Sequence, residues 1–139
     1  MDGRPVNAPP LVDTSLVVRY LTGDVPELAE RAARLLDGPE PVALHSIVLV
    51  EAAFVLEKVY EVPRAEVVNT LVDLLQKKNL HLFDLPKEEA ILALLLARPS
   101  GRVSYADALL WAAAKSHGAE RLYTFDERFP ADGLEVVRP

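Results

Sequence analysis

The chain has 139 residues, of which 50% are hydrophobic, and this length suits one domain with a substantial core. It contains no cysteine, which excludes disulfides, thiolate metal sites and a cysteine nucleophile, and which fits a reducing cytoplasm. The formal net charge of −6 argues against indiscriminate nucleic-acid binding, because phosphate affinity depends largely on lysine and arginine. The apolar runs are far shorter than a membrane-spanning helix requires, so we expect no membrane segment.

Short apolar runs alternate with longer helical patterns along the chain. The expected strands are Leu11–Asp13, Val42–Leu44, Leu80–Phe83, Leu122–Phe125 and, at an edge, Leu134–Val137. The expected helices are Thr14–Leu21, Pro26–Leu36, Ile47–Tyr60 after a Ser46 cap, a helix from Pro63 to about Leu75, Pro86–Ala97 and Ser104–His117. This alternation predicts one α/β domain over residues 1–139, a three-layer sandwich with parallel strands. The role and the order of residues 1–9, the lead into the first strand, stay open.

Three acids stand where strands end or helices begin. Asp13 ends the first strand, Asp126 follows the strand Leu122–Phe125, and Asp107 lies in the first turn of the last helix. In parallel α/β sheets, ligands bind beyond the carboxyl ends of the strands. Each acid also has a local explanation, since Asp13 suits a helix N-cap, Asp107 lies in a capping-box pattern and Asp126 suits a turn. Position alone leaves a ligand role and a capping role both open.

Glu51 lies within the segment Ile47–Leu56, and all the remaining residues of this segment are apolar. A helix that is apolar all round is usually buried, and an ionised carboxylate inside it is costly unless a partner or a cation binds it. We therefore expect Glu51 to be a buried metal ligand. A buried Glu–Arg pair and a narrow solvent-facing stripe are the alternatives.

Four carboxylates in one place would repel each other unless cations lay between them. The four carboxylates offer only oxygen donors. The three histidines are too widely spaced in the chain to form a ligand pair, and we expect them to be structural or on the surface: His45, His81 and His117. The donor chemistry therefore predicts Mg²⁺ or Mn²⁺ rather than zinc. A pair of such ions, about 4 Å apart, activates a water and stabilises the leaving oxygen of a phosphodiester.

Four segments together resemble the motifs of PIN domains. They are Val12-Asp13-Thr14-Ser15, Val50-Glu51-Ala52-Ala53, Tyr105-Ala106-Asp107-Ala108-Leu109-Leu110 and Thr124-Phe125-Asp126-Glu127-Arg128-Phe129. The likeness covers essentially the whole chain and is closest to the VapC-type ribonuclease toxins of toxin–antitoxin pairs. It implies a mostly parallel five-stranded sheet flanked by helices, Mg²⁺- or Mn²⁺-dependent cleavage of RNA, a homodimer and a small antitoxin partner. It also implies that the catalytic, metal-binding residues are Asp13, Glu51, Asp107 and Asp126.

Residues beside these four acids receive supporting roles. Three hydroxyl side chains flank the acids, and we expect them to support the ligands or to orient phosphate: Thr14, Ser15 and Thr124. The candidates for binding RNA are Arg19, Arg98, Arg102 and Arg128, with ordinary surface solvation as the alternative reading of each. We expect Trp111 and Tyr105 to be core or dimer-contact residues rather than partners for stacked bases.

Two other functions remain in view. A phosphoaspartate-type phosphatase or receiver would use Asp13 as its nucleophile, but Ser15 stands where a haloacid-dehalogenase-like phosphatase would have a second acid. A non-catalytic binding module with a PIN fold would need none of the four acids, and all four are present. Loss of RNA cleavage on substitution of Asp13 or Glu51 separates the nuclease from both alternatives.

Overall fold

The computed structural model describes residues 8–139, so residues 1–7 of the predicted lead lie outside the described residues. The helices are α1 (Thr14–Thr22), α2 (Pro26–Leu36), α3 (Ser46–Lys58), α4 (Arg64–Leu75), α5 (Lys87–Ala97) and α6 (Tyr105–Ser116). The strands are β1 (Val42–Leu44), β2 (Leu80–Leu82), β3 (Arg121–Tyr123) and β4 (Glu135–Val137). Every expected helix is present, with ends within two residues of the prediction. No helix in this part of the chain is long and apolar enough to cross a membrane.

Local signals account for most helix ends. Asp13 caps α1, since its carboxylate accepts a hydrogen bond from the backbone N–H of Leu16 at 3.1 Å. Gly23 ends α1 with φ of +65°, a conformation that glycine adopts without strain. At α6, the Ser104 hydroxyl accepts a hydrogen bond from the backbone N–H of Asp107 at 3.0 Å, so the expected cap forms.

The start of α3 differs from the prediction. His45, rather than Ser46, is the N-cap, and its Nδ1 accepts a hydrogen bond from the N–H of Ile47 at 3.0 Å. Ser46 is already helical because Asp84 binds both its backbone N–H, at 2.8 Å, and its hydroxyl, at 2.5 Å. These contacts of Ser46 come from a residue 38 positions further along the chain and leave no local signal.

The strands are parallel, as predicted, but they form two separate two-stranded sheets. One sheet pairs β1 with β2, and the other pairs β3 with β4. The expected first strand is reduced to a single parallel bridge between Leu11 and Ala43. The prediction of one five-stranded sheet is therefore not met among residues 8–139, because no strand pairing joins the two sheets.

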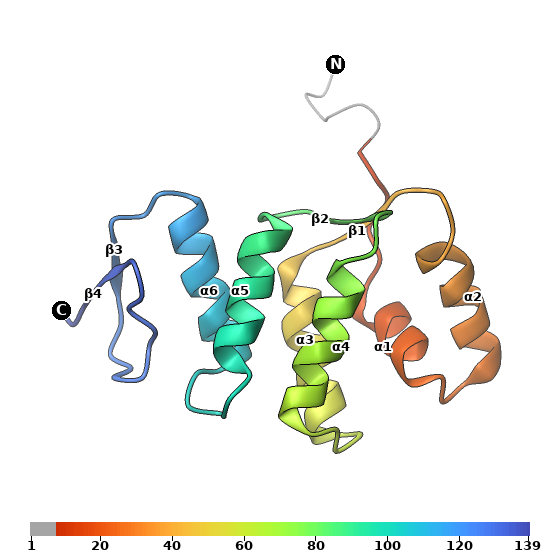
Figure 1. Cartoon of the computed structure of the whole chain (residues 1–139), viewed down its shortest axis with the longest axis horizontal. Coiled ribbons are helices and arrows are strands. Elements are labelled where there is room, and N and C mark those ends of the chain that lie inside the picture. The colour runs from red at the N-terminus through yellow and green to blue at the C-terminus, as the bar shows by residue number, and fades with distance from the viewer. Residues whose placement is uncertain (1–7) are drawn as a thin grey trace.

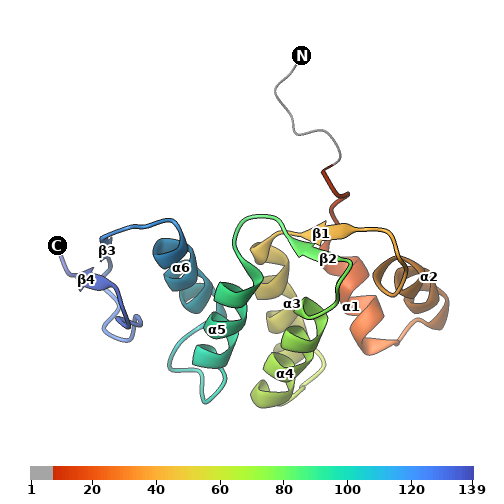
Figure 2. The same ribbon diagram turned by 45° about the horizontal axis from the view of Figure 1, so that its top comes forward.

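The two sheets lie at different places in the molecule. In both Figure 1 and Figure 2, β1 and β2 run along one side of a row of helices, and β3 and β4 lie at its far end beyond α5 and α6. The core fills the space between the helices, where Leu49, Leu71 and Leu94 are almost completely buried. Helices do not cover two faces of one sheet in this arrangement, so the predicted α/β class holds while the three-layer order does not.

Candidate active site

The first two acids lie on neighbouring helices, α1 and α3. The carboxylate of Asp13 accepts hydrogen bonds from the Ser15 hydroxyl at 2.7 Å and from the backbone of Leu16. These bonds lower the pKa of Asp13, the hydroxyl contributing most. One residue further on, the Thr14 hydroxyl donates to Oε1 of Glu51 at 2.8 Å. Thr14 and Ser15, adjacent residues at the start of α1, therefore contact Glu51 and Asp13 respectively.

Glu51 is exposed, so the prediction of a buried carboxylate is wrong. The face of α3 that carries Glu51 also carries Ile47 and Phe54, which are 57% and 59% exposed. The sequence of α3 looks apolar on every side because its water-facing side also carries apolar residues. The solvent-facing alternative describes Glu51 correctly, and burial no longer supports its assignment as a metal ligand.

The other two acids come together across the gap between α6 and β3. Partial burial raises the pKa of Asp107, and the nearby negative charge of Asp126 raises it further. The pKa of Asp126 is lowered instead, mainly because its carboxylate accepts a hydrogen bond from the backbone N–H of Arg128 at 2.8 Å. The hydroxyl of Thr124 accepts a hydrogen bond from the N–H of Asp126 at 3.0 Å and fixes this turn.

The four acids thus fall into two pairs: Asp13 and Glu51 are linked through Ser15 and Thr14 at the start of α1, and Asp107 lies beside Asp126. Among residues 8–139, no three acidic, histidine or cysteine side chains lie close enough together to hold one metal ion. The second pair nevertheless fits a divalent cation by its chemistry, because two carboxylates face each other and the pKa of one is raised by the charge of the other. The structure therefore brings the predicted ligands together two by two.

Of the four predicted RNA-binding arginines, Arg128 lies nearest to an acid of the set. Its Nε is 3.6 Å from Oδ1 of Asp126, beside the backbone hydrogen bond. Arg19 is held instead by Asp24, whose two carboxylate oxygens accept from one guanidinium nitrogen at 2.9 and 2.7 Å. Its positive charge is therefore largely offset inside the chain.

Arg98 and Arg102 belong to the exposed segment that joins α5 to α6. Arg98 donates from Nε to the side-chain oxygen of Asn69 at 3.0 Å, which ties it to α4. Arg102 has an exposed side chain and bonds Ser100 only through its backbone. Surface solvation thus describes Arg102, and a structural contact describes Arg98.

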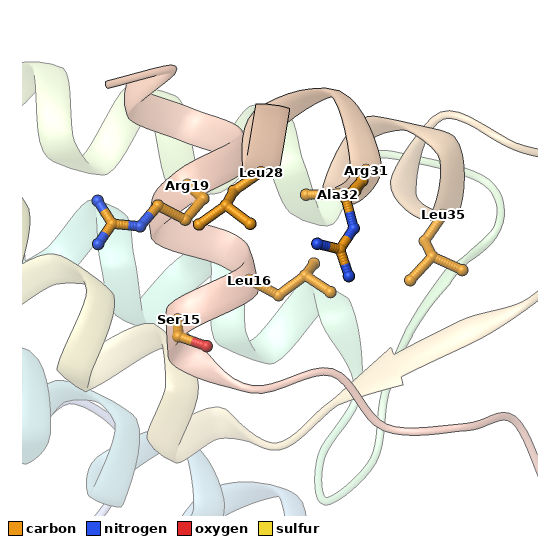
Figure 3. A pocket seen from close by; sticks show the side chains of 7 residues that line it. All are labelled: Ser15, Leu16, Arg19, Leu28, Arg31, Ala32 and Leu35. Atoms are coloured by element: carbon orange, nitrogen blue, oxygen red, sulfur yellow. The ribbon is translucent and has the colours of Figure 1, made fainter. Parts of the chain in front are cut away.

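A pocket of about 510 Å³ opens between α1 and α2 beside the Asp13 site (Figure 3). It is lined by Ser15, Leu16, Arg19, Leu28, Arg31, Ala32 and Leu35. In Figure 3 the guanidinium of Arg31 reaches from α2 toward α1, whereas the guanidinium of Arg19 points away from Arg31 and from α2. Sequence reasoning missed Arg31, although its place on the Leu28–Leu35 face of α2 was a usable signal.

The histidines and the large aromatic residues take the positions expected of them. His45 is a helix cap whose Nε2 lies 3.3 Å from the carboxylate of Asp84, and His81 is exposed on β2. His117 follows α6, where its Nε2 lies 3.3 Å from the backbone oxygen of Asp84. Both aromatic residues, Trp111 and Tyr105, are buried in the core.

These features define an α/β protein with carboxylates at strand ends and helix starts. The model of the PIN domain family matches residues 11–132, and the chain belongs to this family. Among solved structures, the chain is similar to the toxin VapC20 of Mycobacterium tuberculosis, described as cleaving the sarcin-ricin loop. The two are 23% identical, the match covers 93% of this chain and 98% of that one, and the TM-score is 0.42. No curated protein matches the chain.

Proposed function

We propose that this chain is a Mg²⁺- or Mn²⁺-dependent ribonuclease that hydrolyses phosphodiester bonds of RNA. The observation that carries the proposal is the Asp107–Asp126 pair, in which one carboxylate raises the pKa of the other. Such a pair is electrostatically costly unless a cation or a proton is shared between its members. Its occurrence in a PIN-domain chain, at two motif positions of that family, supports a metal site.

The complete metal site would be formed by Asp13, Glu51, Asp107 and Asp126. A bound divalent ion supplies positive charge to the reacting phosphodiester and lowers the pKa of a water. The hydroxyls of Ser15 and Thr14 would keep Asp13 and Glu51 in position. The hydroxyl of Thr124 would keep the turn that carries Asp126 in position. In this proposal water is the nucleophile: its oxygen forms a bond to phosphorus, one P–O bond of the RNA backbone breaks, and the proton of the water passes to the leaving oxygen or to solvent.

The active arrangement requires the two acid pairs to approach each other. We include in the proposal that β3 pairs with the free edge beside Leu11, which would join the two parallel sheets into one of five strands. Leu11 and Tyr123 support this closure, because both are large apolar side chains that are exposed in the open arrangement. Strand pairing would cover them and would bring Asp126 toward Asp13.

RNA would lie across the exposed side of the acids. Arg128 lies beside Asp126 and Arg31 lines the pocket next to Ser15, and in the proposed complex they would contact phosphates on either side of the cleaved bond. The positive charge of Arg31 would attract a phosphate to this pocket. Few cationic contacts are consistent with the net charge of −6 and imply weak binding that depends on the metal.

The decisive experiment measures cleavage of a mixed RNA pool with Mg²⁺, with Mn²⁺ and with a chelator. Wild-type protein should cleave only with metal, and Asp126→Asn should lose activity while remaining folded. A calorimetric titration with Mn²⁺ should show binding to the wild type that is weaker in this variant. A well-folded wild type that neither cleaves RNA nor binds Mn²⁺ would refute the proposal.

The motif resemblance extends the proposal to a toxin that acts in the cytoplasm as a homodimer and is inhibited by a small antitoxin. A short reading frame beside the gene, whose product binds the chain and blocks cleavage, would support this role. The mass of the purified chain in solution tests the homodimer. If Asp13→Asn and Glu51→Gln kept the cellular effect of the wild type, a non-catalytic binding module would replace the nuclease.

A phosphoaspartate enzyme has no comparable support. The described partners of the Asp13 carboxylate are the hydroxyl of Ser15 and the backbone of Leu16, and no lysine is among them. Trapping of Asp13 with beryllofluoride, together with an absence of RNA cleavage, would favour that chemistry instead.

A further inference from the structure

Arg64 is the first residue of α4, and its guanidinium connects three other parts of the chain. Its Nε donates to the backbone oxygen of Ala97, at the end of α5, at 2.6 Å. One terminal nitrogen donates to the backbone oxygen of Val103 at 2.7 Å, and the other contacts the carboxylate of Glu57, on α3, at 3.3 Å. Only 15% of the Arg64 side chain is exposed, so these partners hold a charge that is largely removed from water.

The same guanidinium lies over the ring of Tyr105, 4.2 Å from its centroid. Tyr105 is the first residue of α6 and is buried. Arg64 therefore holds both ends of the segment 98–104, at the backbone of Ala97 on one side and at Val103 and Tyr105 on the other. No other side chain among residues 8–139 makes hydrogen bonds to both of these backbone oxygens.

The end of this segment determines where the Asp107 side chain lies. Val103 directly precedes Ser104, whose hydroxyl accepts the hydrogen bond from the backbone N–H of Asp107. Asp107 is the third residue of a continuous helix, so its position follows from the position of the first turn. A shift of Val103 and Tyr105 would be passed on to the carboxylate that faces Asp126.

We propose that Arg64 is a positioning residue for the nuclease site, and this inference rests on the proposed function. It holds the first turn of α6 so that Asp107 meets Asp126, and it touches neither acid. An arginine is needed here because its planar fork donates to two carbonyls while its face lies over the Tyr105 ring. A lysine supplies a single compact charge and cannot make the same set of contacts.

The test compares Arg64→Gln and Arg64→Lys with the wild type and with Arg34→Gln as a matched control. Arg34 forms an exposed ion pair with Glu30 on α2, remote from α6, so its loss should change nothing in the assay. For each protein, the Mn²⁺ concentration at half-maximal cleavage and the KM for an RNA oligonucleotide are measured at a temperature where all are folded. Both Arg64 variants should need roughly 10-fold more Mn²⁺, the loss typical of residues that orient metal ligands, with KM unchanged.

A purely structural role predicts a different outcome. It would lower the melting temperature and the fraction of active protein, but the folded molecules would keep the wild-type Mn²⁺ requirement. That result would overturn the inference. Arg64→Lys keeps a positive charge beside Glu57, so it decides the question if Arg64→Gln does not fold.

Amide hydrogen exchange of the metal-free protein gives an independent measurement. The backbone N–H of Asp107, bound to Ser104, should exchange faster in the Arg64 variants, while amides in the middle of α3 should not change. Unchanged exchange at Asp107 would refute the positioning role. If the wild type neither cleaves RNA nor binds Mn²⁺, the proposed function fails, whereas the exchange data still show whether Arg64 orders the start of α6.

Discussion

The two acid pairs differ in how their negative charge is stabilised. Asp13 and Glu51 each accept a hydrogen bond from a hydroxyl of the same helix start, at 2.7 and 2.8 Å. Asp107 and Asp126 face each other instead, and the charge of one raises the pKa of the other. Hydrogen bonds thus stabilise the negative charges of the first pair, whereas the two charges of the second pair repel each other, and the proposed cation would reduce that repulsion.

Substitution of Asp107 should have the largest effect on activity. Asp107→Asn removes a carboxylate of the proposed metal site, and we expect cleavage to fall by about 10²-fold or more, as is common when one charged group of an active site is lost. Because the folded protein raises the pKa of Asp107, its ionised form is disfavoured by folding at pH values above the ordinary value of 3.8. The metal-free variant should therefore be at least as stable as the wild type at neutral pH in urea unfolding, and lower stability there would contradict this account.

Asp13 should behave differently in the same assays. Asp13→Asn should lose cleavage to a similar extent, but asparagine still accepts the hydrogen bonds from Ser15 and Leu16 and is an equally good N-cap, so stability should change little. Asp13→Ala should lose the cap as well and be destabilised by about 1 kcal/mol. Equal stability of these two variants would show that the carboxylate does not cap α1.

A cysteine cross-link tests whether the two ends of the molecule come together. The chain has no cysteine of its own, so an introduced pair is unambiguous. Leu11→Cys combined with Leu122→Cys or with Tyr123→Cys samples the two faces of β3. One of these pairs should form a disulfide, since neighbouring strands bring Cα atoms within the required range, and the oxidised protein should still cleave RNA.

The control for the cross-link is Leu11→Cys with Leu92→Cys, whose second position is exposed on α5. This pair should stay reduced under the same conditions. If neither β3 pair forms a disulfide in Mn²⁺, or if the oxidised protein is inactive, the closed arrangement is not the active one.

The hydroxyl that contacts Glu51 should have a moderate effect. Thr14→Val removes the hydrogen bond to Glu51 at nearly the same volume, and we expect cleavage to fall by about 10-fold, with a stability loss below about 1 kcal/mol because the contact is exposed. Thr14→Ser keeps the hydroxyl and should retain most activity. Equal activity of the two variants would remove Thr14 from the site.

The sequence predicted most of the local structure because its signals are local. Pro26 at the start of α2 and Gly23 at the end of α1 act through backbone conformations that need no distant partner. Asp107, in the first turn of α6, and Asp126, after β3, also lie at the positions in the chain that Ser104 and the end of a strand indicated, while their role as ligands stays a prediction. Capping by Ser104 and the end of a short apolar run are both readable from neighbours in the chain.

What the sequence failed to predict depends on distant contacts. Glu51 was expected to be buried because Ile47 and Phe54 made α3 look apolar on every side, and no local pattern shows which side faces water. Arg64 gave no signal at all, since its partners Val103 and Glu57 come from other elements. Strand pairing is likewise non-local: the expected first strand is reduced to a single bridge at Leu11, and within residues 8–139 β3 pairs only with β4, so the predicted single sheet is not formed there.

The smallest expected effect concerns a contact that links the ends of α1 and α3. Asp24 follows α1, and its carboxylate accepts hydrogen bonds from the hydroxyl of Tyr60, at 2.5 Å, and from Arg19. Tyr60 follows α3, so this contact links the ends of the two helices that carry Asp13 and Glu51. These bonds lower the pKa of Asp24 from 3.8 to about 2, with that of Tyr60 contributing most.

The direction of the pH dependence follows from this lowered pKa. The ionised carboxylate stabilises the folded protein fully above pH 3.8, and the stabilisation is lost as the pH falls through about 2. Asp24→Asn should therefore lower the melting temperature slightly at neutral pH, and its difference from the wild type should shrink as the pH falls below 3.8. Asp37→Asn is the matched control, because Asp37 accepts a hydrogen bond from Tyr20 but does not connect α1 to α3. If Asp24→Asn reduced cleavage no more than Asp37→Asn, the first acid pair would not depend on this link between α1 and α3.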